Sequence, residues 1–198
     1  MLFRSLLAIE ISERWQIPVL LRMTTRVCHS CTVVRPRGEA APPPEPHFER
    51  DVAHRVMIPA YARPAHRRLR EKLAAIARWN ETEGPNRVVE GTGARGIITS
   101  GISYMHVREA APEAAVLKLG MTHPLPLGAM REFAMAHSHT TVVEEGDPYL
   151  ADAALAAGLV VETQAALFRF GELNVERVRR ILRGDVSPET TEIGRAHV

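Results

Sequence analysis

Three glycines near the middle of the chain have the spacing of a dinucleotide-binding loop, Gly91-x-Gly93-x-x-Gly96. In nucleotide-binding proteins such glycines follow a strand and open a helix, whose first amides bind the phosphates. Here they precede the predicted strand 96–101, and no helix is predicted between these glycines and Gly101. The spacing therefore predicts a turn between two segments, and a nucleotide site is disfavoured.

The loop after that strand is better placed to bind a ligand. Thr99, Ser100 and Gly101 lie between the strand 96–101 and a predicted helix at 101–111. Hydroxyl groups in this position can cap the helix, and the free amides of the first turn can instead bind an anion. The sequence leaves both roles open.

A second group of candidates is acidic. Glu144 and Glu145 lie near the carboxyl end of the predicted strand 140–146, with Asp147 just beyond it. In open α/β sheets the carboxyl ends of the strands form the edge that faces ligands. Asp147 precedes Pro148 and can equally cap the next predicted helix. Glu144 and Glu145 are therefore candidate ligand-edge carboxylates, with no second partner that would define acid–base catalysis.

The segment Cys28-His29-Ser30-Cys31 has the Cys-x-x-Cys spacing of zinc and redox sites. A structural zinc site needs four ligands, and the chain has only these 2 cysteines. A redox pair normally opens a helix, which favours the thiolate form, and no helical pattern follows here. The segment therefore predicts two unlinked thiols, with Arg26 and His29 as candidates for the edge of a site.

The elements that must position these residues alternate along the second half of the chain. Short apolar runs predict strands, and amphipathic segments predict helices: strands at 96–101, 114–120, 140–146 and 159–163, helices at 101–111, 126–138, 148–158 and 171–184. Strands separated by helices of about ten residues predict a parallel sheet with helices on both faces, a three-layer α/β domain. Asn174 is the expected N-cap of the last helix.

The first part of the chain has a different pattern. Residues 6–16 predict the end of an amphipathic helix, and 17–23 predict a short buried strand. A Pro-rich segment, polyproline-like at 42–44, predicts a linker. Residues 64–84 predict a helix with Pro64 in its first turn, and the basic residues of its first half alternate with apolar ones, which indicates a solvated helix face.

The composition limits the class of protein. The 198 residues are 45% hydrophobic and 24% charged, as in globular domains, and a net charge of +2 gives no global reason to expect nucleic acid or an anionic membrane. No apolar run approaches the ~20 residues that span a bilayer. Two cysteines and the acidic residues Glu10 and Glu13 near the start indicate a cytoplasmic protein. Residues 1–5 and 192–198 resemble translated sequencing adapters, so we expect a fragment of a longer protein.

Several segments, in this order, resemble the large subunit of indolepyruvate:ferredoxin oxidoreductase, a member of the thiamine-diphosphate-dependent 2-oxoacid:ferredoxin oxidoreductases. They are VLLRMTTRVCHS, GIITSGISYMHVREAAPEAAVLKLGMTHPLP, VVEEGDPYLADAALAAG and GELNVERVRRIL. The resemblance covers residues 6–185, except for the detail of the Pro-rich region. No single segment is a fixed catalytic motif, so the match depends on their order.

The resemblance implies an order of domains. Residues 6–35 are the end of a thiamine pyrimidine-binding α/β domain, and 36–87 are a Pro-rich linker and a connecting helix. Residues 88–165 form a transketolase C-terminal-like α/β domain, and 166–191 begin the connection to a diphosphate-binding domain. Because the first domain has lost its sheet, we expect exposed apolar surface around Val19–Leu21.

The resemblance also implies the reaction, which is oxidative decarboxylation of an arylpyruvate with coenzyme A and ferredoxin. In the parent protein a thiamine diphosphate ylid with Mg²⁺ attacks the keto carbon, and [4Fe-4S] clusters carry the electrons away. The glutamate that activates thiamine, the metal-binding segment and the cluster cysteines lie outside this chain, so we expect it to be inactive alone. Arg26 and His29 are implied contacts of the substrate or a neighbouring domain, and no catalytic residue or metal ligand is assigned.

The implied partners are a smaller (beta) subunit, ferredoxin, coenzyme A and the arylpyruvate, without nucleic acid or membrane. Two alternatives stay open. One is a related oxidoreductase that uses pyruvate or another 2-oxoacid. The other is a stand-alone nucleotide- or anion-binding α/β module built on the loop Thr99–Gly101.

Overall fold

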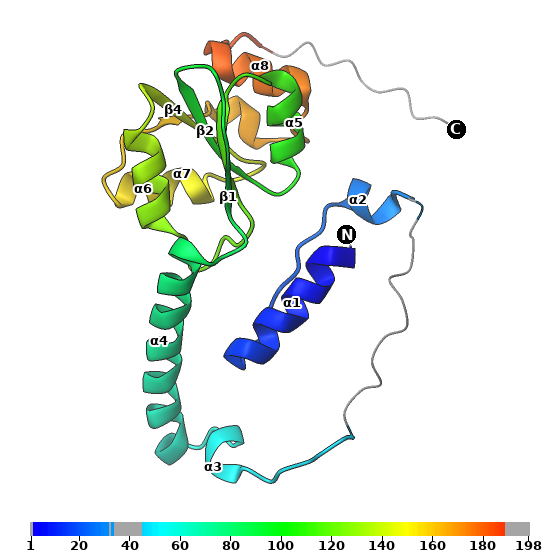
Figure 1. The fold of residues 1–198 in the computed structure, drawn as a ribbon, viewed down its shortest axis with the longest axis vertical. Helices are drawn as coiled ribbons and strands as arrows, with labels where there is room; N and C mark the ends of the chain where they lie inside the picture. Colours follow the sequence, from blue (N-terminus) through cyan, green and yellow to red (C-terminus); the bar gives the residue numbers. More distant parts are fainter. Residues whose placement is uncertain (1, 32, 34–44, 189–198) are drawn as a thin grey trace. The chain divides into compact units, whose positions relative to one another are not determined.

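The computed structural model describes residues 2–31, 33 and 45–188 of the chain (Figure 1). The predicted polyproline segment at 42–44 and the predicted adapter-derived residues 192–198 lie outside the described residues. The chain divides into two compact units, 1–76 and 77–198. We call them unit 1 and unit 2.

Unit 1 is helical in its described part. Its elements are α1 (Leu2–Trp15), α2 (Thr25–His29), α3 (Val52–Arg55) and most of α4 (Pro59–Thr82), which continues into unit 2. Helix α1 begins at Leu2, so residues 2–5, which resemble a translated adapter, form one helix with the residues that follow. The Lys72 ammonium donates a hydrogen bond to the Gln16 carbonyl at 2.9 Å, which ties α4 to the end of α1.

The prediction of a buried strand at 17–23 is wrong. These residues follow α1 without forming a strand, and Leu20 is 93% exposed. A strand needs a neighbour that completes its hydrogen bonds, and no strand occurs in the described part of unit 1. The expected exposed apolar surface is confirmed, because Val19 and Leu21 are 39% and 38% exposed.

Helix α4 begins five residues before the predicted start. Its first residue is Pro59, and the Ile58 carbonyl accepts hydrogen bonds from Tyr61 and Ala62 at 2.9 and 2.8 Å. Pro64 therefore lies inside the helix, not in the first turn as predicted. Proline lacks the N–H that would bond four residues back, and this loss is less severe close to a helix start. Pro59 and Pro64 both suit a helix start, and the sequence pattern alone does not show which of them begins α4.

Unit 2 contains a five-stranded sheet with the order β1-β3-β2-β4-β5. The strands are β1 (Arg87–Val89), β2 (Arg95–Ser100), β3 (Ala115–Leu119), β4 (His139–Val143) and β5 (Glu162–Thr163). Strands β2 to β5 pair in parallel, as predicted. Strand β1 was missed and pairs antiparallel with β3 at the edge. With only three residues it is too short to show a period in the sequence.

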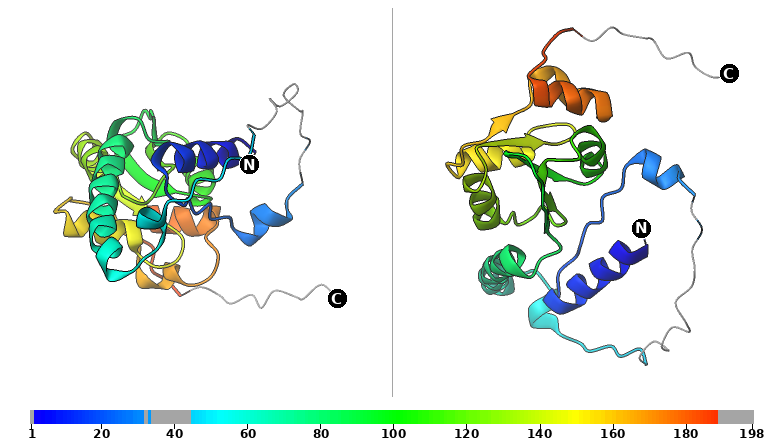
Figure 2. Two further views of the ribbon diagram at one scale, coloured as in Figure 1. Left: turned by 90° about the horizontal axis from the view of Figure 1, so that it is seen from below. Right: turned by 45° about the horizontal axis from the view of Figure 1, so that its top comes forward.

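Helices cover both faces of this sheet (Figures 1 and 2). They are α5 (Ser103–Ala110), α6 (Leu127–Met135), α7 (Tyr149–Ala156) and α8 (Val175–Arg183), with a short 3₁₀ helix η1 (Ala166–Arg169) before α8. Helices α5 and α8 pack on the face that holds Ile97, Val116 and Val143. Helices α6 and α7 pack on the face that holds Ile98 and Leu117. The predicted three-layer α/β class is confirmed.

The strand residues of the two core clusters are almost fully buried, as expected for a parallel sheet between helices. Asn174 caps α8 as predicted, because its side-chain oxygen accepts a hydrogen bond from the Arg177 amide at 2.9 Å. None of the helices in the described part of the chain is long and apolar enough to cross a bilayer.

Candidate functional site

The carboxyl edge of the parallel strands is where the candidate residues of unit 2 meet. Strands β2, β3 and β4 end there at Ser100, Leu119 and Val143, and each is followed by the N-terminus of a helix, α5, α6 and α7 respectively. In this sheet type the N-terminal amides of such helices face any ligand at the edge. The three helix starts therefore decide what the edge can bind.

Helix α7 is capped by the carboxylate of Glu144. Its Oε2 accepts a hydrogen bond from the Leu150 amide at 2.7 Å, and its Oε1 accepts one from the Ala151 amide at 2.9 Å. Burial raises the pKa of Glu144, although the same amide hydrogen bonds oppose the rise. The alternative that Asp147 caps this helix is wrong, since the cap residue is Pro148 and it makes no side-chain bond.

Helix α6 is also capped by a glutamate, which comes from far away in the sequence. The Glu81 carboxylate, near the end of α4, accepts hydrogen bonds from the Gly128 and Ala129 amides at 3.0 and 2.8 Å. A Cβ at Gly128 would lie 3.0 Å from a Glu81 oxygen, so glycine leaves room for the carboxylate. Glu81 was not predicted as a cap, because nothing in the sequence near α6 indicates its partner.

Helix α5 has no side-chain cap. Its cap residue is Ile102, and within the described residues no side chain is found to accept a hydrogen bond from its first amides. The predicted cap by the hydroxyls of Thr99 or Ser100 is therefore wrong, because both residues belong to strand β2. Gly101 has φ of +57°, a left-handed conformation that favours glycine, and no atom lies within 4 Å of an added Cβ. The start of α5 is thus an open helix N-terminus next to an exposed glycine.

A buried hydroxyl lies on the same face of the sheet as α5. The alternation along β2 places Thr99 on the side of Ile97, which packs with α5 and α8. Thr99 is fully buried, and its Oγ1 has no hydrogen-bond partner among the residues that the structure describes. A buried hydroxyl without a partner is costly, so this group has unused capacity to bind a polar atom.

Two cations lie next to the first turn of α5. Arg87 and Lys118 are opposite each other in the β1–β3 pair, and Lys118 is also the register partner of Thr99. The Lys118 ammonium is 4.3 Å from the Tyr104 ring centre, and Arg87 donates a hydrogen bond to the Tyr104 hydroxyl at 2.8 Å. Positive charge at a helix N-terminus favours an anion. Strand β1 was not predicted, so Arg87 was missed as well.

The remaining predicted carboxylate, Glu145, is partly buried and makes no hydrogen bond or ion pair with the side chains that the structure describes. That Glu144 or Glu145 contacts a ligand stays a prediction. Both oxygens of Glu144 already accept hydrogen bonds within the fold.

The three glycines of the nucleotide-like spacing have structural roles. An added Cβ at Gly91 would lie 2.2 Å from the backbone nitrogen of Ala115, so the chain passes close to the start of β3. The Gly93 amide donates to the Glu113 carbonyl at 3.2 Å. Gly96 lies inside strand β2, and no helix follows it directly. The predicted position of this segment, before a strand and not before a helix, is confirmed.

The cysteine segment lies in unit 1, apart from the sheet in sequence. Arg26, Cys28 and His29 belong to helix α2, where no helix was predicted, and Cys31 follows it. Both thiols are free and exposed. In residues 2–31, 33 and 45–188 no three His, Cys, Asp or Glu side chains form a group that could hold a metal ion. An iron–sulfur cluster held by four cysteines does not fit, because the chain has only 2 cysteines.

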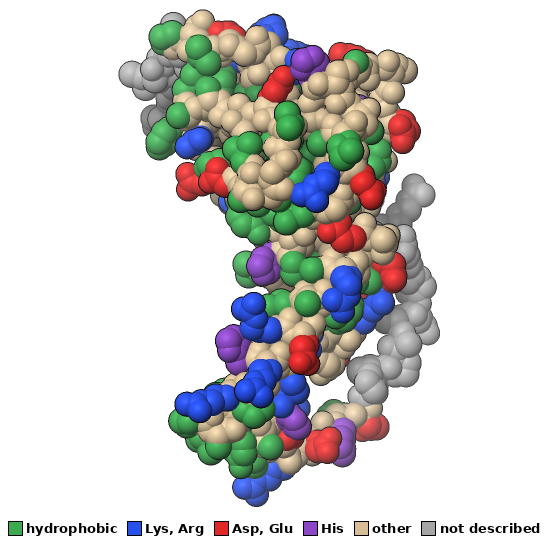
Figure 3. All heavy atoms as spheres, turned by 90° about the vertical axis from the view of Figure 1, so that its left-hand side faces the viewer, with side chains coloured by type: hydrophobic (Ala, Val, Ile, Leu, Met, Phe, Trp, Pro, Cys, Tyr) green, Lys and Arg blue, Asp and Glu red, His purple; other side chains and the backbone are tan. Residues whose placement is uncertain are grey.

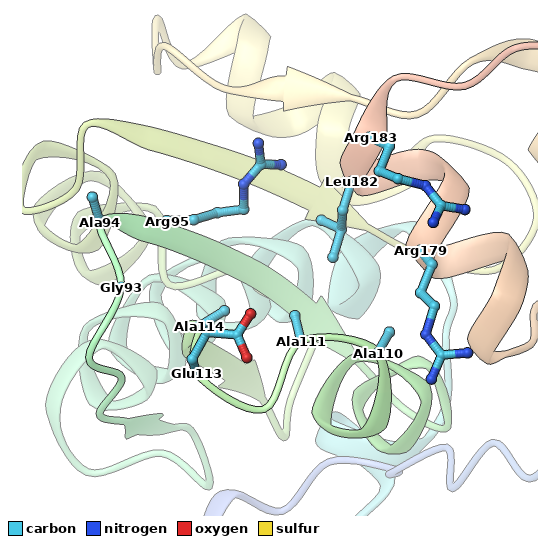
Figure 4. A pocket seen from close by; sticks show the side chains of 10 residues that line it. All are labelled: Gly93, Ala94, Arg95, Ala110, Ala111, Glu113, Ala114, Arg179, Leu182 and Arg183. Atoms are coloured by element: carbon cyan, nitrogen blue, oxygen red, sulfur yellow. The ribbon is translucent and has the colours of Figure 1, made fainter.

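A hollow of about 470 Å³ lies at the opposite, amino edge of the sheet. It is lined by Gly93, Ala94, Arg95, Ala110, Ala111, Glu113, Ala114, Arg179, Leu182 and Arg183 (Figure 4). Its three guanidinium groups point in different directions (Figure 4). Arg179 and Arg183 both pair with Glu176, at 3.4 and 3.0 Å, and Arg95 lies 3.6 Å from Glu162. Because these cations already have carboxylate partners, the hollow is the weaker candidate.

Two asparagines that the sequence analysis missed fix the loop before α6. The buried Asn80 side chain donates to the Pro124 carbonyl at 2.9 Å, and Asn86 donates to the Asn80 side-chain oxygen at the same distance. The Asn86 oxygen accepts from the Gly120 amide at 2.9 Å. The sequence offers only one sign of this arrangement, which is that Asn80 lies next to Trp79 on the apolar side of the helix.

Comparison with known proteins identifies relatives of the chain, although no protein-family model matches it. It is 38% identical over 149 residues to "Indolepyruvate oxidoreductase subunit IorA" of Methanothermobacter thermautotrophicus, covering 72% of this chain and 24% of the relative. The same subunit of Methanothermobacter marburgensis is 34% identical over 201 residues, covering 94% and 32%. That of Archaeoglobus fulgidus is 37% identical over 153 residues, covering 73% and 24%.

Over these residues the chain belongs to the family of IorA subunits of indolepyruvate oxidoreductase. It spans about a quarter to a third of the length of these relatives. Among solved structures it is similar to a 2-oxoglutarate:ferredoxin oxidoreductase from Magnetococcus marinus with 2-oxoglutarate, coenzyme A and succinyl-CoA bound. That match has a TM-score of 0.46 and 19% identity, over 66% of this chain and 24% of the other.

Proposed function

We propose that this chain is part of an oxidoreductase that converts arylpyruvates, indolepyruvate above all, into aryl-acetyl-CoA. The 2-oxoacid loses carbon dioxide, its acyl carbon is transferred to the coenzyme A sulfur, and the two electrons released reduce ferredoxin. The observation that carries the proposal is the identity of 30–38% to six IorA subunits, over 71–94% of this chain. In this proposal the enzyme is cytoplasmic and includes a smaller subunit.

Within that enzyme the α/β domain of unit 2 acts as a scaffold. Thiamine diphosphate, Mg²⁺ and iron–sulfur clusters would supply the carbanion chemistry and the electron path in the parent protein. The described residues offer no metal-ligand group, and Glu144 and Glu81 are used as helix caps. The domain would therefore hold neighbouring domains in position, with Arg26 and His29 proposed as contacts of the substrate or of such a domain.

The test is an assay of the full-length protein with its smaller subunit. Reduction of ferredoxin is measured with coenzyme A and a panel of 2-oxoacids. We expect the highest kcat/KM with indolepyruvate, and a preference for pyruvate or 2-oxoglutarate would instead support the related oxidoreductases. The 198-residue chain alone serves as the control, and turnover by this chain would contradict the scaffold role.

A second candidate function is anion binding at the start of α5, by Thr99, Ser100 and Gly101. It is supported by the missing side-chain cap of α5, the buried Thr99 hydroxyl and the nearby cations Arg87 and Lys118. A phosphate of coenzyme A or a carboxylate has the fitting charge. Calorimetry of the 198-residue chain with coenzyme A, adenine nucleotides and sulfate tests this, and the absence of heat with all three would contradict it.

A further inference from the structure

Unit 1 carries an apolar surface at α3 and the start of α4. Four large apolar side chains within seven residues are 42–57% exposed: Val52, Val56, Met57 and Ile58. The Ile58 carbonyl accepts the first hydrogen bonds of α4, so these residues lead directly into that helix. Exposed apolar side chains that lie together, unlike scattered ones, mark an interaction surface. We call residues 52–70 the α3–α4 surface.

A stripe of basic side chains continues this surface along α4. Arg63, His66, Arg67 and Arg70 are spaced as i, i+3, i+4 and i+7, which places them on one side of the helix. All four are exposed, and no ion pair with a described carboxylate is found for the three arginines. Figure 3 shows Lys and Arg side chains, with some His, gathered along this part of the molecule beside hydrophobic side chains.

A groove of about 480 Å³ lies at the start of α4. It is lined by Pro59, Ala60, Arg63, Pro64 and Arg67, so that apolar side chains lie beside two guanidinium groups. Such a groove fits an apolar side chain, and the guanidinium groups can bind carboxylates on either side of it. The stripe between residues 63 and 70 extends for about 10 Å along the helix, enough for a few carboxylates.

We propose that the α3–α4 surface is the docking site for an acidic surface of another protein, with an apolar side chain at its centre. The proposal rests on the proposed function, in which the chain is a subunit and therefore has a protein partner. Arginine and methionine are enriched at protein–protein interfaces, and complementary charge gives such contacts their specificity. Nucleic acid fits less well, because the apolar groove has no counterpart on a phosphate backbone and the chain's net charge is only +2.

The test measures binding of a fluorescein-labelled peptide, a central leucine flanked by glutamates, to the 198-residue chain by fluorescence anisotropy. We expect R63E/R67E to raise the Kd at least ten-fold. The double variant R108E/R169E makes the same charge change at a partly buried and an exposed position of unit 2 and should leave the Kd within two-fold. Circular dichroism confirms that each variant keeps its helix content.

Two further measurements identify the kind of molecule that binds the α3–α4 surface. Replacing the leucine of the peptide by serine should weaken binding by about three-fold or more, because the groove would lose its apolar side chain. Duplex DNA and phosphatidylserine vesicles are measured in parallel. Equal peptide binding by R63E/R67E and the wild type, or tighter binding of DNA or vesicles through the same arginines, would overturn the proposal. No turnover is measured, so this outcome is independent of the proposed reaction.

Discussion

Helices α6 and α7 differ from α5 in what lies at their first turns. All three begin at the same edge of one sheet, and each follows a parallel strand. Helices α6 and α7 each receive a glutamate carboxylate that accepts two amide hydrogen bonds, whereas no side chain in the described part of the chain caps α5. A helix N-terminus prefers a negative group. The fold therefore supplies its own anion at two positions and leaves the third free for one from outside.

The two carboxylates reach their helices by different routes. Glu144 lies only six residues before the Leu150 amide that it binds, and the chain buries it between strand and helix. Glu81 lies 47 residues before Gly128 and comes from helix α4. One cap is thus a property of a local loop, and the other depends on how α4 ends beside the sheet of unit 2.

The largest effect is expected for Glu144→Ala. The Leu150 and Ala151 amides would be left without a partner in a buried place, so we expect unit 2 to lose about 2 kcal/mol of its free energy of unfolding. Urea denaturation of the 198-residue chain, followed by a signal from unit 2, measures it. Glu145→Ala is the matched control and should be nearly neutral. A loss of similar size in both variants would contradict the cap.

A smaller effect is expected for Glu81→Ala. The two amides of α6 are closer to solvent, and water can replace the carboxylate in part, so the loss should be about 1 kcal/mol. Hydrogen exchange measures the local effect, and the Gly128 and Ala129 amides should exchange faster in the variant than in the wild type. Glu132→Ala, on the exposed side of α6, should leave these rates unchanged.

Thr99→Val tests the open helix start. The change removes a buried hydroxyl that has no partner among the described residues, so stability should stay equal or rise by about 0.5 kcal/mol. Thr140→Val is the matched control, since Thr140 Oγ1 is also buried and likewise lacks a described partner. We expect only Thr99→Val to weaken sulfate or coenzyme A binding in calorimetry. An equal effect of both variants on binding would place the anion elsewhere.

The smallest effect is a dependence on pH. Burial raises the pKa of Glu144 in the folded state, so between the ordinary glutamate value and the raised one the folded chain binds more protons than the unfolded chain. Stability therefore falls as pH rises through this interval. The difference in unfolding free energy between wild type and Glu144→Gln should fall with rising pH across it and be flat above. A difference that increases with pH would show that the amide hydrogen bonds outweigh burial.

Much of unit 2 could be predicted because its elements have local signatures. The paired apolar residues of β2, β3 and β4 are hidden from water on both faces, and that requirement is visible in the sequence. Asn174 could be assigned as a cap because an N-cap bonds within its own turn. Residues 17–23 have the same apolar signature as a buried strand, yet they form none, because a strand also requires a neighbour that the sequence pattern does not specify.

The candidate site was predicted only in outline. The sequence indicated the loop after β2 and the carboxylates after β4, and both lie at the carboxyl edge of the sheet. It assigned the cap of α7 to Asp147 as one alternative, whereas Glu144 makes it. The cations beside α5 could not be predicted, because Arg87 lies in a three-residue strand whose antiparallel pairing depends on contacts with β3.

The sequence by itself determined the alternation of β2 to β5 with α5 to α7, the parallel three-layer class and the family, since these depend on local periodicity and residue identity along the chain. The tertiary structure alone decided which carboxylate meets which helix, and that the start of α5 is left without one. The physical reason is distance along the chain. A hydrogen bond such as that from Gly128 to Glu81 joins residues 47 apart and has no signature in either neighbourhood.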